Sequence, residues 1–268
     1  MNLPLFRAHD DPGPSFAELL RRTGFDGTTA FDGGTGFDGT VPVADFRHGT
    51  TCVAVRYADG VLLAGDRRAT SGNLISHRGI EKVFPADRHS GVAIAGAAGP
   101  AIEMVKLFQL QLEHYEKVEG VMLSLEGKAN QLGQMIRGNL PAAMQGLAVV
   151  PIFAGFDVGR DEGRLFEYDV TGGRYEETEN ASTGSGSLHA GTVLRMGYRD
   201  SLDAEAVTDL ALESLFEAAD QDSATGGPDP VRGIYPVVAL ITRAGYRRLD
   251  DDELADRTQA LIERRRNR

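Results

Sequence analysis

The segment His48-Gly49-Thr50-Thr51 places a threonine where a shortened chain could begin. If the chain were cut after Gly49, Thr50 would carry a hydroxyl and a free α-amine on one residue. An α-amine has an unperturbed pKa of about 7.7–8.0, so near neutral pH it can accept the hydroxyl proton, which an ordinary lysine cannot do. Such a residue is a nucleophile with its own general base. A lone Gly-Thr-Thr more often marks the plain start of a strand, so the surrounding segments must decide.

Two charged residues follow Thr50 at equal spacing. Asp66 lies sixteen residues after Thr50, at the end of an apolar strand, and Lys82 lies sixteen residues after Asp66 in a mostly apolar segment. A lysine in such a setting needs a paired charge, and Asp66 is the obvious partner. Further on, the segment Ala95-Gly96-Ala97-Ala98-Gly99 joins a predicted strand to a helix, so its backbone N–H groups can point at an anion. Each of these features is weak alone.

Other catalytic and cofactor motifs fail on their spacing. Gly184-Ser185-Gly186-Ser187 resembles a phosphate-binding loop, but no glycine follows three residues after Gly186, and Thr183 stands where the elbow of a serine esterase needs glycine. The six histidines form no i,i+4 pair and no H-E-x-x-H motif, and the single cysteine, Cys52, cannot build a thiolate zinc site. We therefore expect no metal and no cofactor.

The composition is that of a globular protein and excludes several classes of function. Of the 268 residues, 41% are hydrophobic and 25% are charged. A net charge of −11 argues against general nucleic-acid binding, because the phosphate backbone would repel the chain. The apolar stretches are far shorter than the roughly 20 residues that cross a bilayer, and Met1–Asp11 has no apolar signal-peptide region. With one cysteine, these features predict a cytoplasmic protein that does not enter membranes.

The first 49 residues differ from the remainder. The hexapeptide Thr23-Gly24-Phe25-Asp26-Gly27-Thr28 returns intact at residues 35–40, with a partial copy between the two. Ahead of these repeats, Ser15 could cap a short helix that runs to Leu20, which is too short to be stable alone. Residues 1–49 therefore read as an appendage that docks on another surface or is removed.

From Thr50 onward the pattern predicts packed structure. Strands are expected over 51–55 and 61–64, joined around Asp59-Gly60, and then over 91–95, 149–157, 165–170, 174–177, 235–242 and 246–249. Helices are expected with Val105, Phe108, Leu112 and Tyr115 on one face, around 128–145, after Ser187, from a cap near Asp203, and over 251–266. Because like elements cluster, this order favours antiparallel sheets covered by helices over regular βαβ alternation.

Taken together, six segments resemble the proteasome β subunit family in order over residues 50–241. They are Gly49-Thr50-Thr51, Gly65-Asp66-Arg67-Arg68-Ala69-Thr70, Ile80-Glu81-Lys82-Val83, Ala95-Gly96-Ala97-Ala98-Gly99, Gly184-Ser185-Gly186-Ser187 and Asp222-Ser223-Ala224-Thr225-Gly226-Gly227. The long leader is most similar to the actinobacterial branch. The resemblance implies an α+β fold, a four-layer αββα N-terminal-nucleophile hydrolase sandwich of two antiparallel sheets. It also implies a propeptide over 1–49, removed on maturation, and a catalytic domain over 50–268.

The resemblance assigns a role to each matching residue. Thr50 is the expected nucleophile, released by autocatalytic cleavage between Gly49 and Thr50, so that the chain as written is an inactive zymogen. Asp66 and Lys82 are the charged pair beside it, and Lys82 as a cation favours ionisation of the Thr50 hydroxyl. The Gly96 N–H is the expected oxyanion donor. The hydrogen-bond network around the free amine is expected to comprise Ser185, Asp222 and Thr225, the last at a position where the family commonly has serine.

The same resemblance implies how substrate is held. Ala69, Thr70 and Ala98 match positions where the family pairs its backbone with an extended substrate. Ile80, Phe84, Ile94 and Ile102 match its specificity pocket and are all apolar here. The expected activity is therefore that of a threonine endopeptidase which degrades unfolded proteins with a preference for cleavage after large apolar residues.

The implied partners are other subunits. Copies of the chain are expected to form two stacked rings, capped by rings of proteasome α subunits, with an ATP-driven unfoldase ring acting indirectly through the α ring. Three alternatives remain open: a catalytically silent ring subunit of the same fold, a binding module that uses the glycine-rich repeats, and a stand-alone amidase of the same fold. A monomer of about 28.8 kDa would favour the amidase.

Overall fold

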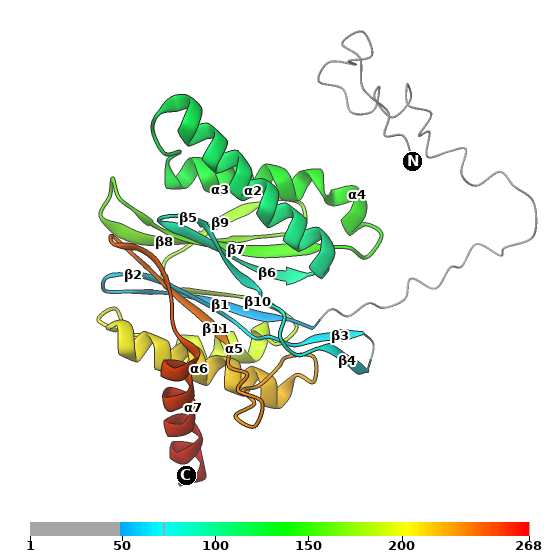
Figure 1. Ribbon diagram of the computed structural model, residues 1–268, viewed down its shortest axis with the longest axis vertical. Coiled ribbons are helices and arrows are strands. Elements are labelled where there is room, and N and C mark those ends of the chain that lie inside the picture. The colour runs from blue at the N-terminus through cyan, green and yellow to red at the C-terminus, as the bar shows by residue number, and fades with distance from the viewer. Residues whose placement is uncertain (1–48, 72, 268) are drawn as a thin grey trace, which may run out of the picture. The chain divides into compact units, whose positions relative to one another are not determined.

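The computed structural model describes residues 49–71 and 73–267. Two five-stranded antiparallel sheets lie between two groups of helices (Figure 1), which is the expected α+β sandwich. One sheet has the order β10-β1-β2-β11-β12, the other the order β5-β6-β7-β8-β9, and β3 pairs with β4 in a separate hairpin. The predicted leader helix over Ser15–Leu20 and the repeats lie outside the described residues.

The bounds of the elements are as follows. The strands are β1 Thr51–Tyr57, β2 Gly60–Gly65, β3 Ala69–Ser71, β4 Leu74–His77, β5 Val83–Asp87, β6 Ser90–Gly96, β7 Val149–Asp157, β8 Glu162–Tyr168, β9 Arg174–Glu177, β10 Asn180–Gly184, β11 Val237–Thr242 and β12 Gly245–Arg248. The helices are α2 Ala98–Glu119, α3 Leu125–Gly138, α4 Leu140–Ala143, α5 Ser187–Gly197, α6 Ala204–Gln221 and α7 Asp251–Arg266.

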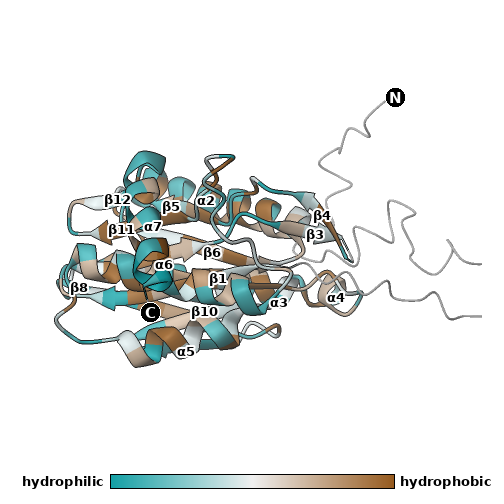
Figure 2. Cartoon of the chain, turned by 90° about the horizontal axis from the view of Figure 1, so that it is seen from below, coloured by the Kyte–Doolittle hydropathy of each residue, from teal (hydrophilic) through white to brown (hydrophobic). Residues whose placement is uncertain are grey.

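Alternation along β1 explains why the molecule has layers. Val53 and Val55 face the helices α5 and α6, while Cys52 and Ala54 face the second sheet, and all four side chains are fully buried. A third cluster, which includes Phe108, Phe153 and Phe166, fills the space between the second sheet and α2 and α3. Side chains of successive strand residues point to opposite faces, so a strand that is apolar at every position must be covered on both sides. Figure 2 shows the result: brown gathers on the strands, while the outward sides of the helices are largely teal.

The structure corrects several expectations about single elements. The helix expected around 128–145 is two helices, because α3 ends at Gly138 and Pro141 then lies in the first turn of α4. Tyr115 is 37% exposed and does not share the buried face of α2 with Phe108 and Leu112. The strand expected at 165–170 runs instead from Glu162 to Tyr168, and the strands β3, β4, β5 and β10 were not expected.

Candidate active site

Thr50 directly precedes β1, which is paired on both sides. Strand β1 pairs with β2 on one side and with β10 on the other, with Thr51 opposite Gly184. The Ser185 N–H donates to the Thr50 carbonyl oxygen at 2.8 Å. Thr50 is only 5% exposed. The turn after β10 therefore fixes the carbonyl group of the predicted nucleophile, and the two neighbouring strands fix the residues that follow it.

Asp66 and Lys82 form the expected pair. Asp66 follows β2 and Lys82 precedes β5, and the Lys82 Nζ lies 2.6 Å from the Asp66 Oδ1. Three backbone N–H groups also donate to the Asp66 carboxylate, from Thr51 at 2.8 Å, Arg68 at 2.9 Å and Gly226 at 2.8 Å. The Asp66 side chain is fully buried, so these partners replace the water that a carboxylate would otherwise bind.

The Lys82 ammonium group also reaches the Gly49–Thr50 peptide. Its Nζ donates to the carbonyl oxygen of Arg68 at 2.6 Å and to that of Gly49 at 3.3 Å. The Thr50 hydroxyl lies 2.7 Å from the same Gly49 oxygen. A hydroxyl and a cation thus meet at one carbonyl group, which is an arrangement suited to acyl transfer.

Ser185, Asp222 and Thr225 form a second cluster on the other side of Thr50. The Ser185 Oγ lies 3.4 Å from the Thr50 nitrogen, and both Ser185 Oγ and Thr225 Oγ1 donate to the Asp222 Oδ2. Partial burial acts to raise the pKa of Asp222. The hydrogen bonds from Ser185, Thr225 and the Ala224 N–H outweigh that effect and hold the pKa below its usual value. The cluster therefore presents a carboxylate beside the Thr50 nitrogen.

Thr51 belongs to this cluster, although we gave its side chain no role from the sequence. Its Oγ1 lies 2.5 Å from the Thr225 Oγ1 and accepts the Gly186 N–H at 3.0 Å. The two threonines are 174 residues apart in the chain, so their spacing gave no signal. The fold brings them together, because Thr225 follows α6, and α6 packs against β1.

A small apolar hollow opens beside Thr50. Its lining includes the predicted substrate-binding residues Ala69, Ile80, Ile94, Ala98 and Ile102, the predicted oxyanion donor Gly96, and Gly49 itself. Thr70 and Phe84 are not part of this lining. The Thr70 Oγ1 accepts the Gly49 N–H at 3.3 Å, and Phe84 packs against the core under α2 and α3.

The thiol of Cys52 is another nucleophilic group, close to the Asp66–Lys82 pair. Burial raises the pKa of Cys52 to about 12, and the charge of Lys82 only partly opposes that effect. The thiol donates to the Ile94 carbonyl oxygen at 3.4 Å. Because a thiol rather than a thiolate is present at neutral pH, Cys52 does not compete with Thr50 as a nucleophile.

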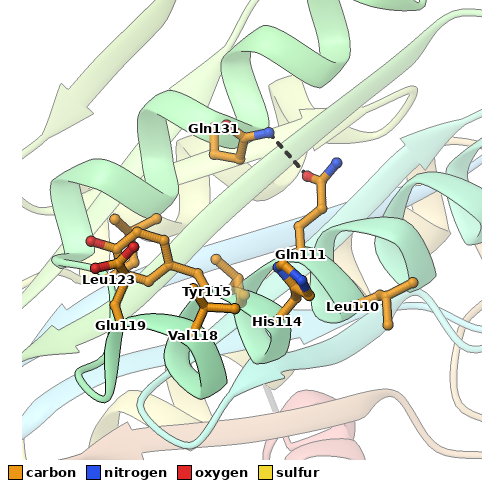
Figure 3. A pocket seen from close by; sticks show the side chains of 9 residues that line it. Leu110, Gln111, His114, Tyr115, Val118, Glu119, Leu123 and Gln131 are labelled. Carbon is orange, nitrogen blue, oxygen red and sulfur yellow. Dashed lines mark hydrogen bonds between the residues drawn. The ribbon is translucent and has the colours of Figure 1, made fainter.

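A larger hollow, of about 540 Å³, lies between α2 and α3 (Figure 3). Across it the Gln131 Nε2 donates to the Gln111 Oε1 at 3.0 Å. Its lining has His114, Glu119 and Tyr115 among apolar side chains, but it shares no residue with the hollow at Thr50. Thr50 and Lys82 thus line the smaller of the two hollows.

Within residues 49–71 and 73–267, no group of three or more His, Cys, Asp and Glu side chains is placed to hold a metal ion. Over the same residues, no helix combines the length and apolar character that crossing a membrane requires.

Comparison with known proteins agrees with this geometry. The family model described as "Proteasome subunit" matches residues 46–231. A protein named "Proteasome subunit beta" from Acidimicrobium ferrooxidans is 58% identical over 261 residues, which cover 95% of this chain and 91% of the relative. Another of the same name from Streptomyces griseus is 59% identical over 218 residues, 81% of this chain and 78% of the relative. The chain therefore belongs to the proteasome subunit family.

Proposed function

We propose that this proteasome subunit is a threonine endopeptidase, made as an inactive precursor, with Thr50 as its nucleophile. One observation carries the proposal: the Thr50 hydroxyl and the Lys82 ammonium group lie 2.7 Å and 3.3 Å from the same Gly49 oxygen. While Gly49 is attached, the nitrogen of Thr50 is an amide and cannot act as a base. Removal of residues 1–49 creates the α-amine that the mechanism needs.

Maturation is proposed to be intramolecular. The Thr50 oxygen attacks the carbonyl carbon of Gly49, and the hydroxyl proton passes to the departing Thr50 nitrogen as the Gly49–Thr50 C–N bond breaks. The resulting ester is hydrolysed by water, which releases residues 1–49 as an acid and restores the hydroxyl. Lys82 stabilises the oxyanion in both steps. Position 49 has no room for a side chain, because a Cβ there would lie 2.1 Å from the Cβ of Ala224.

The mature site would cleave substrates by the same chemistry. The α-amine accepts the proton of the Thr50 hydroxyl as its oxygen attacks the substrate carbonyl, then passes it to the leaving amine. Water completes the cycle by hydrolysing the acyl-enzyme ester. Ser185 and Asp222 hold the amine, and the Gly96 N–H together with Lys82 stabilises the oxyanion. The γ-methyl of threonine restricts χ1 and so keeps the hydroxyl aimed.

The apolar hollow supports a preference for cleavage after Tyr, Phe or Leu. Its lining by Ile80, Ile94 and Ile102 presents apolar surface to a substrate side chain next to Thr50. Ala69, the first residue of β3, and Ala98, the first residue of α2, both line this hollow. The backbone of Ala69 and Thr70, together with that of Ala98, would pair with an extended, unfolded substrate.

Membership of the family implies assembly with further subunits. We propose that copies of this chain form two stacked rings in the cytoplasm, capped by proteasome α subunits. An ATP-driven unfoldase ring would act through the α rings. Enclosure explains how a general peptidase spares folded proteins, since these cannot enter the chamber. The Thr50 sites would line that chamber.

Intact mass after co-expression with the α partner tests the proposal. Loss of residues 1–49 leaves 268 − 49 = 219 residues. We expect Thr50→Ala to stay full length and to be inactive on fluorogenic peptides, while the matched control Thr192→Ala, on an exposed face of α5, is processed and active. A Thr50→Ala chain that loses its leader as fast as the parent would show that another protease removes it. A parent particle without Thr50-dependent peptidase activity would indicate a silent ring subunit, and an active monomer would indicate a stand-alone amidase.

A further inference from the structure

The hydroxyl groups around Asp222 form a line whose direction can be assigned. The Thr225 Oγ1 donates to the Asp222 Oδ2 at 2.6 Å, which uses its single proton, because an ionised carboxylate only accepts. The Thr51 Oγ1 lies 2.5 Å from the Thr225 Oγ1, so the proton between them belongs to Thr51. Thr51 in turn accepts the Gly186 N–H at 3.0 Å. The line therefore runs from Gly186 through Thr51 and Thr225 to Asp222.

We infer that Thr51 is a positioning residue for the Thr50 site, and that it acts through its side-chain hydroxyl. The hydroxyl fixes the Gly186 N–H at one end and the Thr225 oxygen at the other. Gly186 follows Ser185, whose Oγ lies 3.4 Å from the Thr50 nitrogen. Thr225 shares the Asp222 oxygen that Ser185 also contacts. One hydroxyl thus holds both segments that face the nitrogen of the nucleophile.

Thr51 also contacts the charged half of the site. Its backbone N–H donates to the Asp66 Oδ1 at 2.8 Å, the oxygen that pairs with Lys82. The residue therefore joins the Asp66–Lys82 pair, through its backbone, to the Ser185–Asp222 cluster, through its side chain. The charged groups around it are Asp66 and Lys82 on one side and Asp222, with His189 beyond it, on the other.

Neither water nor a shifted loop can replace the hydroxyl. Thr51 and Thr225 are both fully buried. A Cβ on Gly186 would lie 2.4 Å from the Thr51 Oγ1 and 2.8 Å from the Thr225 Oγ1, so the three groups are already in close contact. Without the hydroxyl, the Gly186 N–H and the Thr225 oxygen would both lose a buried partner, and an unpaired buried group is costly.

Two substitutions separate the hydroxyl from the shape of the side chain. Thr51→Val keeps the branched shape and removes the hydroxyl, whereas Thr51→Ser keeps the hydroxyl and removes the methyl group. Each variant is co-expressed with the α partner, the processed fraction is measured by intact mass, and kcat and KM on an apolar fluorogenic peptide are taken per processed chain. We expect Thr51→Val to lower kcat, or the rate of leader loss, by about tenfold or more, with KM unchanged. Thr51→Ser should stay within about threefold of the parent.

The opposite ranking would overturn the inference. If Thr51→Val is as active as the parent, or Thr51→Ser is the worse of the two, the side chain serves only to pack the core. If Thr51→Val does not fold, the comparison of Thr51→Ser with Thr51→Ala decides, because these two differ only in the hydroxyl. Equal activity of that pair would refute a role for the hydroxyl.

A double-mutant cycle tests whether Thr51 acts through Thr225. If Thr51 acts through Thr225, Thr51→Val should add little loss of kcat in a Thr225→Val background, because the line is already broken there. Full additivity of the two losses would refute the coupling. The inference rests on the proposed function, and the two fail separately: an activity that survives Thr50→Ala removes the proposed function, whereas the ranking of the Thr51 variants is read only where activity depends on Thr50.

Discussion

Replacing Lys82 by alanine removes the cation on which the proposed chemistry depends. The Asp66 carboxylate would keep its three backbone donors, from Thr51, Arg68 and Gly226, but would lose the ammonium group at 2.6 Å. Breaking a buried ion pair costs about 3–5 kcal/mol, and the three remaining hydrogen bonds place this case near the lower end of that range. For a chain of this size, about 3 kcal/mol corresponds to a fall in Tm of roughly 6–12 °C.

The effect on chemistry should exceed the effect on stability. The Lys82 Nζ is 3.3 Å from the Gly49 oxygen, where negative charge develops during attack, so its loss should slow leader removal by about 10²–10³-fold or more. Lys82→Arg should also process poorly, since a planar guanidinium group does not replace a compact ammonium group that donates to Asp66 and to the carbonyl oxygens of Gly49 and Arg68.

A second buried lysine supplies the matched control. The Lys128 Nζ lies 2.5 Å from the Asp87 Oδ2, with its side chain 5% exposed, and the pair joins α3 to β5 away from Thr50. We expect Lys128→Ala to lower the Tm by a similar amount and still to lose residues 1–49, while Lys82→Ala stays full length. Thermal unfolding gives the Tm and intact mass gives the fraction of processed chain, both from one preparation. If folded Lys82→Ala is processed about as fast as Lys128→Ala, Lys82 has no part in the mechanism.

Three further changes have defined outcomes. Gly49→Ala should slow leader loss by at least about tenfold, because its Cβ would lie 2.1 Å from the Cβ of Ala224. The control Gly138→Ala, whose Cβ would have no atom within 4 Å, should lose its leader at the normal rate. Equal processed fractions of the two variants by intact mass would refute the steric argument. Ile102→Glu places a carboxylate in the hollow beside Thr50 and should shift cleavage from after Leu and Tyr toward after Lys and Arg. A panel of fluorogenic peptides would measure this shift. An unchanged preference would show that this hollow does not bind the side chain before the cleaved bond. Because hydrogen bonds hold the pKa of Asp222 below its usual value, its carboxylate adds stability above the unfolded pKa of about 3.9 and loses it as the pH falls through the lower folded pKa. Urea unfolding should therefore separate Asp222→Asn from the parent at pH 7, and the difference in unfolding free energy should shrink as the pH falls below about 3.9. A difference that does not depend on pH would contradict this.

The sequence predicted the longer elements with a clear pattern well and missed several short strands. Strand β7 and helix α7 begin and end where expected, because their patterns are long and strongly punctuated. Strand β10 is built of small and polar residues and becomes a strand only because β1 pairs with it. Strand β5 contains Pro85, which argues against a strand, but β5 lies at the edge of its sheet, where proline is tolerated.

The candidate site was likewise predicted only in part. The resemblance named Thr50, Asp66 and Lys82, and the structure places the Thr50 hydroxyl and the Lys82 ammonium group at one carbonyl oxygen, with Asp66 paired to Lys82. Thr51 was missed because its role depends on a hydroxyl far along the chain and on the direction of a proton. Phe84, which was expected in the specificity pocket, packs against the same core cluster as Ile94 and Ile102 but does not line the hollow itself. The roles themselves, and the boundary after residue 49, stay predictions.

The position of β1 inside its sheet has a consequence for what happens once the leader is gone. New chain ends usually fray, because terminal residues have few contacts to lose. Here the strand behind the new end is bonded on both flanks, by β10 from Thr51 and by β2 from Cys52, and the Thr50 carbonyl oxygen accepts the Ser185 N–H. The cut would therefore release a charged amine without releasing the backbone that carries it. In hydrogen exchange, the amides from Cys52 to Val55 should open only with the whole domain, so that the new chain end would be attached directly to one of the most rigid strands of the mature chain.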